Sequence, residues 1–158
     1  YPGTFDPITY GHLDLIKRAL CVFDEVIIAV AVRGSEKKNL FKAQERIDLI
    51  KQAVKNMKHV SVESFDGLIV DYAREKGADA MLRGIRMLSD FEYEFQMALT
   101  NRKLAPNIET IFLMPSESYA YLSSRLIKEI ASLGGKIDSF VPSFVAKALY
   151  KKYENHTE

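Results

Sequence analysis

A short run of apolar, mostly β-branched residues constrains the fold of this chain more than any other feature. The segment from Glu25 to Val32 contains Val-Ile-Ile-Ala-Val-Ala-Val without a polar interruption. Such a run is typical of a strand buried on both faces, because a strand with one face in water would alternate apolar and polar residues. Apolar residues at helical spacing precede it in residues 11–23 and follow it in residues 42–55. A strand between two amphipathic helices predicts a parallel sheet with crossover helices.

The same alternation continues to the end of the chain. We expect further strands at residues 60–64, 80–82 and 110–113, and further helices at residues 68–76, 89–104, 123–133 and 142–153. Pro2-Gly3 has the composition of a loop, so we expect a first strand ahead of Tyr1. The predicted fold class is α/β, a single doubly wound parallel sheet with helices on both faces. We predict one domain over residues 1–158, with a disordered tail in the last few residues.

In a doubly wound sheet, ligands bind at the carboxyl ends of the strands, near the point where the strand order reverses. Five predicted loops follow strand ends and carry the polar candidates for a site. They are residues 4–12, 33–38, 65–69, 83–86 and 115–125. We therefore expect these loops to meet in one crevice.

Composition narrows the class of function. The 158 residues carry a formal net charge of +1, so no global field would attract a nucleic acid or a membrane surface, and we expect neither as a partner. No apolar run approaches the ~20 residues of a membrane span, and we find no signal peptide, so we expect a cytoplasmic protein. Cys21 is the only cysteine, which excludes an intrachain disulfide and a thiolate metal site. Its apolar neighbours predict a place in the core.

The first dozen residues place a phosphate-binding arrangement at the start of the first helix. They run Tyr-Pro-Gly-Thr-Phe-Asp-Pro-Ile-Thr-Tyr-Gly-His, and the helical pattern begins at Gly11. A helix N-terminus presents unpaired N–H groups and the positive end of the helix dipole, which attract phosphate. Gly11 allows a close approach to the backbone, and His12 directs an imidazole donor to the same place. The dipole disfavours a protonated ring there, so we expect a neutral His12.

Other signatures of phosphate, metal and acyl chemistry are absent from the sequence. It contains no G-x-x-x-x-G-K-[ST], no G-x-G-x-x-G, no H-E-x-x-H and no G-x-S-x-G. These absences argue against P-loop kinases, dehydrogenases, zinc hydrolases and serine hydrolases.

Residues 4–12 resemble the signature of the nucleotidylyltransferase superfamily, whose loop ends in (His/Thr)-x-Gly-His and here runs Thr-Tyr-Gly-His. Three further segments are similar to the phosphopantetheine adenylyltransferases within that superfamily. They are residues 83–102, with Arg-Gly-Ile-Arg, Asp-Phe-Glu-Tyr-Glu and Asn-Arg; residues 112–116, Phe-Leu-Met-Pro-Ser; and residues 122–129, with Leu-Ser-Ser and Lys-Glu. The resemblance covers about residues 1–150. It implies a Rossmann-like fold, a homohexamer, and adenylyl transfer from ATP, with Mg²⁺, to 4′-phosphopantetheine.

The resemblance also implies roles for individual residues. Catalysis, as stabilisation of the transferring phosphate, is implied for His12, Lys37 and Arg86. The residues implied to bind ATP are Thr4, Phe5, His12, Gly84, Ile85, Arg86, Glu94, Tyr119, Ala120, Tyr121, Leu122, Ser123, Ser124 and Arg125. Those implied to bind 4′-phosphopantetheine are Thr4, Lys37, Ile69 and Arg83. No residue is implied as a metal ligand.

Two positions depart from the family pattern. The loop at residues 33–40 is one residue longer than the common form, so Lys37 and Lys38 could exchange roles. Arg125 stands where many relatives carry Ser or Thr, and it either reaches a distal ATP phosphate or faces solvent. Three aromatic residues of the helix predicted at residues 89–104 are expected in the core or in subunit contacts: Phe91, Tyr93 and Phe95.

Two other functions stay open from the sequence. A sibling transferase that adenylylates nicotinate mononucleotide or cytidylylates glycerol phosphate shares the first loop, although residues 83–101 argue against it. A non-catalytic nucleotide-binding module shares the fold, but gives His12, Lys37 and Arg83 no reason to meet in space.

Overall fold

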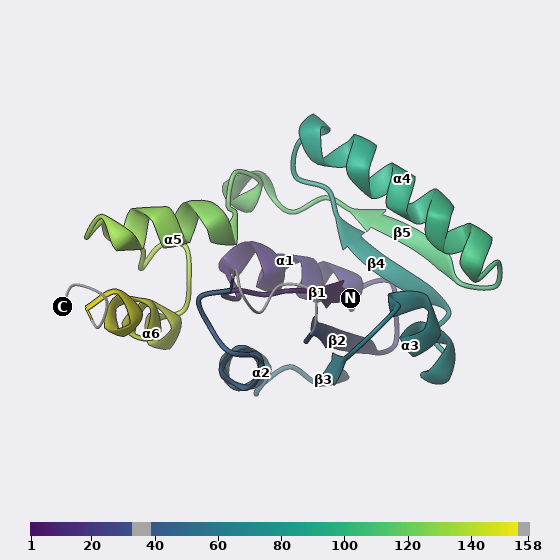
Figure 1. Cartoon of the computed structure of the whole chain (residues 1–158), viewed down its shortest axis with the longest axis horizontal. Helices are drawn as coiled ribbons and strands as arrows, with labels where there is room; N and C mark the ends of the chain where they lie inside the picture. The colour runs from purple at the N-terminus through teal and green to yellow at the C-terminus, as the bar shows by residue number, and fades with distance from the viewer. Residues whose placement is uncertain (33–38, 155–158) are drawn as a thin grey trace.

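The fold is built from parallel strands, and the strand order reverses between the first strand and the fourth. The computed structural model describes residues 1–32 and 39–154 (Figure 1). One parallel ladder joins β1 (Pro2–Gly3), β2 (Val26–Ala31) and β3 (Val60–Phe65) in that order, and a second joins β4 (Ala80–Gly84) to β5 (Glu109–Leu113). No ladder joins β1 to β4 among the described residues, but the two strands are in contact, so the two sheets lie side by side in the order β3-β2-β1-β4-β5. The switch point therefore lies between β1 and β4.

Helices alternate with the strands, as the sequence pattern predicts. They are α1 (Tyr10–Ala19), α2 (Ala43–Val54), α3 (Ile69–Glu75), α4 (Leu88–Leu104), the short 3₁₀ turn η1 (Glu117–Tyr119), α5 (Ser124–Ser132) and α6 (Ser143–Glu154). In Figure 1, α4 lies along β5 on one side of the molecule, and α2 lies beside β2 and β3 on the other. The strand order runs outward from β1 to β3 and from β4 to β5 in opposite directions, and crossovers of the usual right-handed kind then place helices on both faces. The predicted α/β, doubly wound class is confirmed.

Burial of β2 anchors the main core. Ile28 and Val30 are completely buried, which confirms the strand predicted from the uninterrupted apolar run. The cluster around β2 draws on α1, α2, α5 and α6, through Ile16, Ile50, Ile127, Val145 and Leu149. Each buried aliphatic side chain of this size contributes about 1.5–3 kcal/mol of transfer free energy. The C-terminal helices are thus attached to the core that also supports the first strand–helix connection.

Three local predictions were wrong. Pro2-Gly3 is a strand and not a loop, because parallel pairing with Ala29 and Val30 outweighs the weak strand propensity of proline and glycine. Helix α1 ends at Ala19 rather than near residue 23, and Phe23 N–H donates to the Ala19 carbonyl in the turn that follows. Cys21 lies in this turn and is exposed, so its predicted core position is incorrect.

Two sequence predictions fall outside the described residues: the lysines of the loop at 33–38 and the tail at 155–158. Among the described residues, none of the helices combines the length and the apolar character needed to span a bilayer.

Candidate active site

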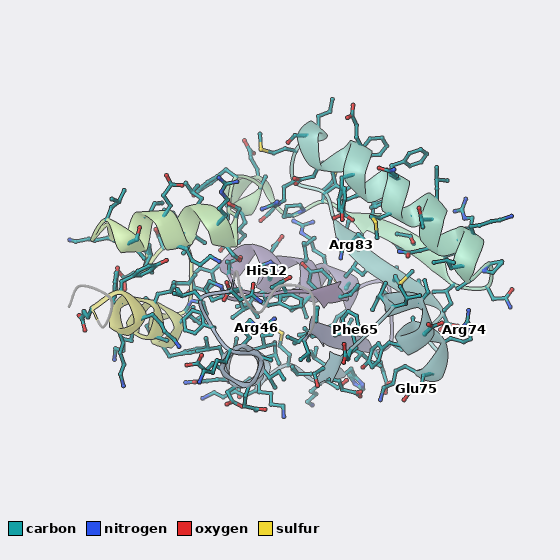
Figure 2. The ribbon with its side chains drawn as sticks, in the orientation of Figure 1. His12, Arg46, Phe65, Arg74, Glu75 and Arg83 are labelled. Carbon is teal, nitrogen blue, oxygen red and sulfur yellow. The ribbon has the colours of Figure 1, made fainter. Side chains whose placement is uncertain are left out.

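One cavity opens at the switch point between β1 and β4. It has a volume of about 390 Å³ and is lined by the loop after β1, the start of α1, the end of β4 and the start of α5. Thr4, His12 and Arg83 all line it, although they come from loops far apart in the chain. Figure 2 labels His12 beside α1, Arg83 beside β4 and Arg46 close to α2. A cavity of this size falls within the range of small-molecule sites.

The first turn of α1 orients the His12 ring. Thr9 is the N-cap residue, and its Oγ1 accepts a hydrogen bond from the His12 backbone N–H at 3.3 Å. In return, the Thr9 backbone N–H donates to His12 Nδ1 at 3.0 Å. Because a backbone N–H can only donate, Nδ1 is an acceptor and the neutral ring carries its proton on Nε2. Capping the helix therefore leaves Nε2–H as the donor for a ligand.

The environment of His12 keeps the ring neutral. Burial, and secondarily the positive charge of Arg86, lower the pKa of His12 to about 4. The predicted neutral state at pH 7 is thus supported, although burial rather than the helix dipole is the main cause. A neutral imidazole can donate one hydrogen bond to an anion without first having to lose a proton.

The turn between β1 and α1 is built around Phe5. Its φ of 50° lies in the left-handed region, which is unusual for an aromatic residue and occurs at sites where the surroundings impose it. The buried Phe5 ring packs edge-on against His12, with ring centroids 5.1 Å apart. A Cβ on Gly3 would approach the same ring to 2.9 Å, so this position requires glycine. The backbone conformation of Phe5 and the packing of its ring together fix the position of Thr4 relative to His12.

Arg46, on α2, holds this turn in place through hydrogen bonds. It is completely buried on α2, and its Nη1 donates to the carbonyls of Thr4 at 2.6 Å and Ala31 at 3.0 Å. The guanidinium therefore ties the loop between β1 and α1 to the end of β2. Arg46 had no predicted role; the available signal was an arginine on the apolar face of a helix, next to Ile47 and one turn before Ile50.

Arg83 and Glu94 form a two-pronged ion pair at the opposite wall. Arg83 Nε and Nη2 donate to the two carboxylate oxygens of Glu94 at 2.7 and 2.6 Å, and Nη1 donates to the Pro2 carbonyl at 3.0 Å. A planar guanidinium held in this way has further N–H groups with which to bind phosphate. Glu94 orients Arg83 through this ion pair and also lines the cavity, so its predicted contact with the nucleotide stays a prediction.

The start of α5 closes a third side of the cavity. Ser123 caps the helix by accepting from the Leu126 N–H at 3.1 Å, and Ser124 Oγ donates to the Pro7 carbonyl at 2.7 Å. Arg86 Nη1 donates to the Leu122 carbonyl at 2.8 Å and so holds the approach to this helix. Ser123, Ser124 and Arg125 line the cavity, so the start of a helix and an arginine, both of which favour anions, come together there.

Comparisons with known proteins identify the family. The profile of the cytidylyltransferase-like family matches residues 1–130. A phosphopantetheine adenylyltransferase of Caldanaerobacter subterraneus subsp. tengcongensis is 54% identical over 154 residues, which cover 98% of this chain and 96% of that protein. One from Thermodesulfovibrio yellowstonii gives the same identity and coverage. This chain belongs to the phosphopantetheine adenylyltransferase family.

Solved structures extend the likeness at the level of fold. A bifunctional NMN adenylyltransferase/ADP ribose pyrophosphatase from Francisella tularensis superposes with a TM-score of 0.71 at 16% identity, over 98% of this chain and 50% of that one. A putative nicotinate-nucleotide adenylyltransferase from Vibrio parahaemolyticus gives 0.66 at 18% identity, over 94% of each chain. The adenylyltransferase family member described here therefore has the Rossmann-like nucleotidylyltransferase fold.

Most residues that the family resemblance points to meet in the cavity. Those that line it are Thr4, Phe5, His12, Arg83, Gly84, Arg86, Glu94, Tyr119, Leu122, Ser123, Ser124 and Arg125. Ile85, Ala120 and Tyr121 belong to the same loops but do not line it. Lys37 and Lys38 lie outside the described residues, so the choice between them stays a prediction.

Ile69 is the predicted residue that the fold places elsewhere. It lines a separate hollow of about 410 Å³, together with Ala80 and Met81 near the start of β4. Its predicted contact with the pantetheine arm of the adenylyltransferase substrate therefore gains no support from this cavity. Asp6 and Lys128, by contrast, line the adenylyltransferase cavity without a predicted role. The available signal was a pair of opposite charges in two segments that the sequence predicted to bind phosphate.

Proposed function

We propose that this chain transfers the adenylyl group of ATP to 4′-phosphopantetheine, giving dephospho-coenzyme A and pyrophosphate. The family relationship supports this reaction. The single observation that carries the proposal is the meeting of Thr4, His12 and Arg83 with the start of α5 in one cavity. Such a cavity offers donors and cations on several sides, as two phosphorylated ligands require.

The chemistry asks little of the protein except positioning and charge. The acceptor phosphate is already anionic at neutral pH, so it needs no general base. One of its oxygens forms a bond to the α-phosphorus of ATP while the bond to the bridging oxygen of the β-phosphate breaks, and the electron pair leaves with pyrophosphate. The site must bring two anions into line and stabilise the crowded phosphorus.

The residues of the cavity divide this work. His12 Nε2–H donates to an oxygen of the α-phosphate, where charge develops during transfer. Arg83, held by Glu94, binds the acceptor phosphate. The start of α5 and Arg125 bind the β- and γ-phosphates, since helix N-termini and arginine both favour anions. Lys37 is proposed to contact the transferring phosphate.

Mg²⁺ is part of the proposal as a companion of ATP. Within residues 1–32 and 39–154, no group of three His, Cys, Asp or Glu side chains is placed to hold a metal ion. The cavity carboxylates Asp6 and Glu94 already accept from Lys128 and Arg83. This donor set suits Mg²⁺ carried by the nucleotide, because Mg²⁺ keeps several waters and binds through substrate phosphates with few protein ligands. When bound it would neutralise phosphate charge. The cytoplasm, where ATP is available, is the proposed location.

An acceptor-dependent assay tests the reaction. With MgATP present, we expect pyrophosphate release only when 4′-phosphopantetheine is added, and none with nicotinate mononucleotide. Glycerol phosphate with CTP serves as a further control. The measurement is coupled detection of pyrophosphate, with mass spectrometry of the product. Turnover with either control acceptor in place of 4′-phosphopantetheine would contradict the substrate, and ATP binding without turnover would support a non-catalytic module.

We also propose assembly into a homohexamer through the outer face of α4. None of the residues of α4 is buried, yet Leu88, Phe91, Phe95 and Leu99 form an exposed apolar stripe at helical spacing. Leu88 is 90% exposed, and the rings of Phe91 and Phe95 stack with centroids 5.5 Å apart. A contiguous apolar stripe of this kind is typical of a protein–protein interface.

Charge placed on this stripe should weaken the assembly. We expect the double variant Phe91→Lys/Phe95→Lys to run as smaller species than the unaltered chain, because lysine cannot be buried in an apolar interface without a partner. Light scattering coupled to size-exclusion chromatography gives the mass. Leu133→Lys is the matched control, since Leu133 is 82% exposed at the end of α5. A monomeric unaltered chain, or a double variant of unchanged mass, would rule out this interface.

A further inference from the structure

We propose that Asp6 is a positioning residue that holds the segment at Leu40 and Phe41, just before α2, and helix α5 in register with the loop between β1 and α1. This inference rests on the proposed function. It starts from the buried polar side chains: among the described residues these are Asp6, Thr9 and Arg46, and all three bond to the loop between β1 and α1 or lie within it. Thr9 caps α1 and Arg46 holds Thr4, which leaves Asp6 to be explained.

The Asp6 carboxylate accepts three hydrogen bonds at 4% exposure. Oδ1 accepts from the Phe41 backbone N–H at 2.9 Å. Oδ2 accepts from the Leu40 backbone N–H at 3.0 Å and from Lys128 Nζ at 2.6 Å. Hydrogen bonds to an ionic group are short and strong, and both oxygens of this carboxylate are used. These three donors satisfy the carboxylate, as a buried charged group requires.

The partners of Asp6 come from the segments that the reaction must bring together. Leu40 and Phe41 follow residues 33–38, which contain Lys37, with only Asn39 between them. Lys128 lies on α5 four residues beyond Ser124, one turn after the helix start that is proposed to hold the distal ATP phosphates. Asp6 itself stands two residues after Thr4 in the phosphate-binding loop. One carboxylate therefore joins the segment that follows Lys37 in the sequence to the helix proposed to hold the distal ATP phosphates.

The geometry predicts a loss of rate when this junction is disturbed. Asp6→Asn keeps the size of the side chain but replaces one acceptor oxygen with an NH₂ group, which then faces the Lys128 ammonium or a backbone N–H. At least one of the three hydrogen bonds is lost, and the segment at Leu40 and Phe41 and helix α5 shift relative to His12. Because a displacement of about 1 Å in a reacting array can lower a rate on the order of 10²-fold, the effect should fall on kcat.

A four-variant comparison tests the inference. The variants are Asp6→Asn, Lys128→Met, the double variant of both, and Glu45→Gln as the matched control. Glu45 also accepts from a backbone N–H, that of Lys42 at 2.7 Å, and from a lysine, Lys152 at 2.9 Å, but it lies outside the cavity. For each variant, kcat, the KM of both substrates and the melting temperature are measured.

We expect Asp6→Asn to lower kcat by roughly 10- to 10²-fold, with smaller changes in both KM values. Lys128→Met should lower kcat less, and the double variant should be no slower than Asp6→Asn, since both changes remove the same ion pair. Glu45→Gln should lower the melting temperature and leave kcat unchanged.

Three results would overturn the inference. The first is an Asp6→Asn enzyme with unchanged kcat and only a lower melting temperature, which indicates a purely structural role. The second is a double variant whose loss equals the product of the two single losses, which indicates that Lys128 binds ATP independently of Asp6. The third applies if Asp6→Asn does not fold: an unchanged kcat in Lys128→Met then overturns the inference. Absence of turnover in the unaltered chain, a separate outcome, contradicts the proposed reaction and this inference with it.

Discussion

The His12→Ala variant should turn over about 10²- to 10³-fold more slowly than the unaltered chain, the scale of losing one preorganised donor to a transition state. Its affinity for ATP should change little, because the Nε2–H contributes mainly when charge develops on the α-phosphate. Thr9 holds the ring in place before any ligand binds, so the donor requires no reorganisation during the reaction. The measurements are kcat at saturating substrates and the ATP dissociation constant by calorimetry.

A second histidine provides the control for this variant. His59 has φ of 61° at the start of β3 and does not line the cavity. Asparagine tolerates that backbone region, so His59→Asn should fold and keep the normal rate. An unchanged kcat in His12→Ala, or an equal loss in His59→Asn, would remove His12 from the mechanism.

The pH dependence of the unaltered chain and of His12→Ala separates the effect of His12 on the reaction rate from its effect on the free energy of unfolding. With its pKa at about 4, below the ordinary 6.5, His12 stays neutral through the physiological range and adds no acid limb to the rate near pH 6.5. Between pH 6.5 and about 4, the unfolded chain binds a proton that the folded chain rejects. The free energy of unfolding therefore falls as the pH drops through this window. His12→Ala should lose this part of the slope, as measured by denaturant titration at several pH values.

Arg83→Lys should raise the KM for 4′-phosphopantetheine on the order of 10²-fold and raise the KM for ATP much less. Lysine keeps the positive charge but cannot bond both oxygens of Glu94 and a phosphate together. Glu94 then loses its two-pronged partner, while the Pro2 carbonyl loses its donor. Initial rates across a matrix of both substrate concentrations give the two constants.

Glu94→Gln separates the contribution of the orientation of Arg83 from the contribution of its positive charge. It keeps the Arg83 guanidinium but weakens the contacts that orient it, so we expect a smaller rise in the same acceptor KM. An equal weakening of ATP and acceptor in Arg83→Lys would show that Arg83 does not face the acceptor phosphate.

Local patterns were sufficient to predict the alternation of strands and helices and the helix start that presents His12. These features depend on neighbouring residues: the β-branched run of β2, and Thr9 three residues before His12 at the N-cap. Predictions that depended on distant partners did less well. Pro2-Gly3 is a strand because it pairs with β2, and no local pattern predicted that Glu94 accepts two hydrogen bonds from Arg83, eleven residues away.

By itself, the sequence determined the α/β class, the loop that leads into the first helix and the family, because periodicity and motif are written in short stretches of chain. Only the tertiary structure decided what holds that loop. The buried charges Asp6 and Arg46 find partners 15 to 122 residues away, and no local pattern encodes such pairs. Burial makes these pairs necessary, since a charged side chain inside the protein is stable only where folding brings its partners within hydrogen-bond distance.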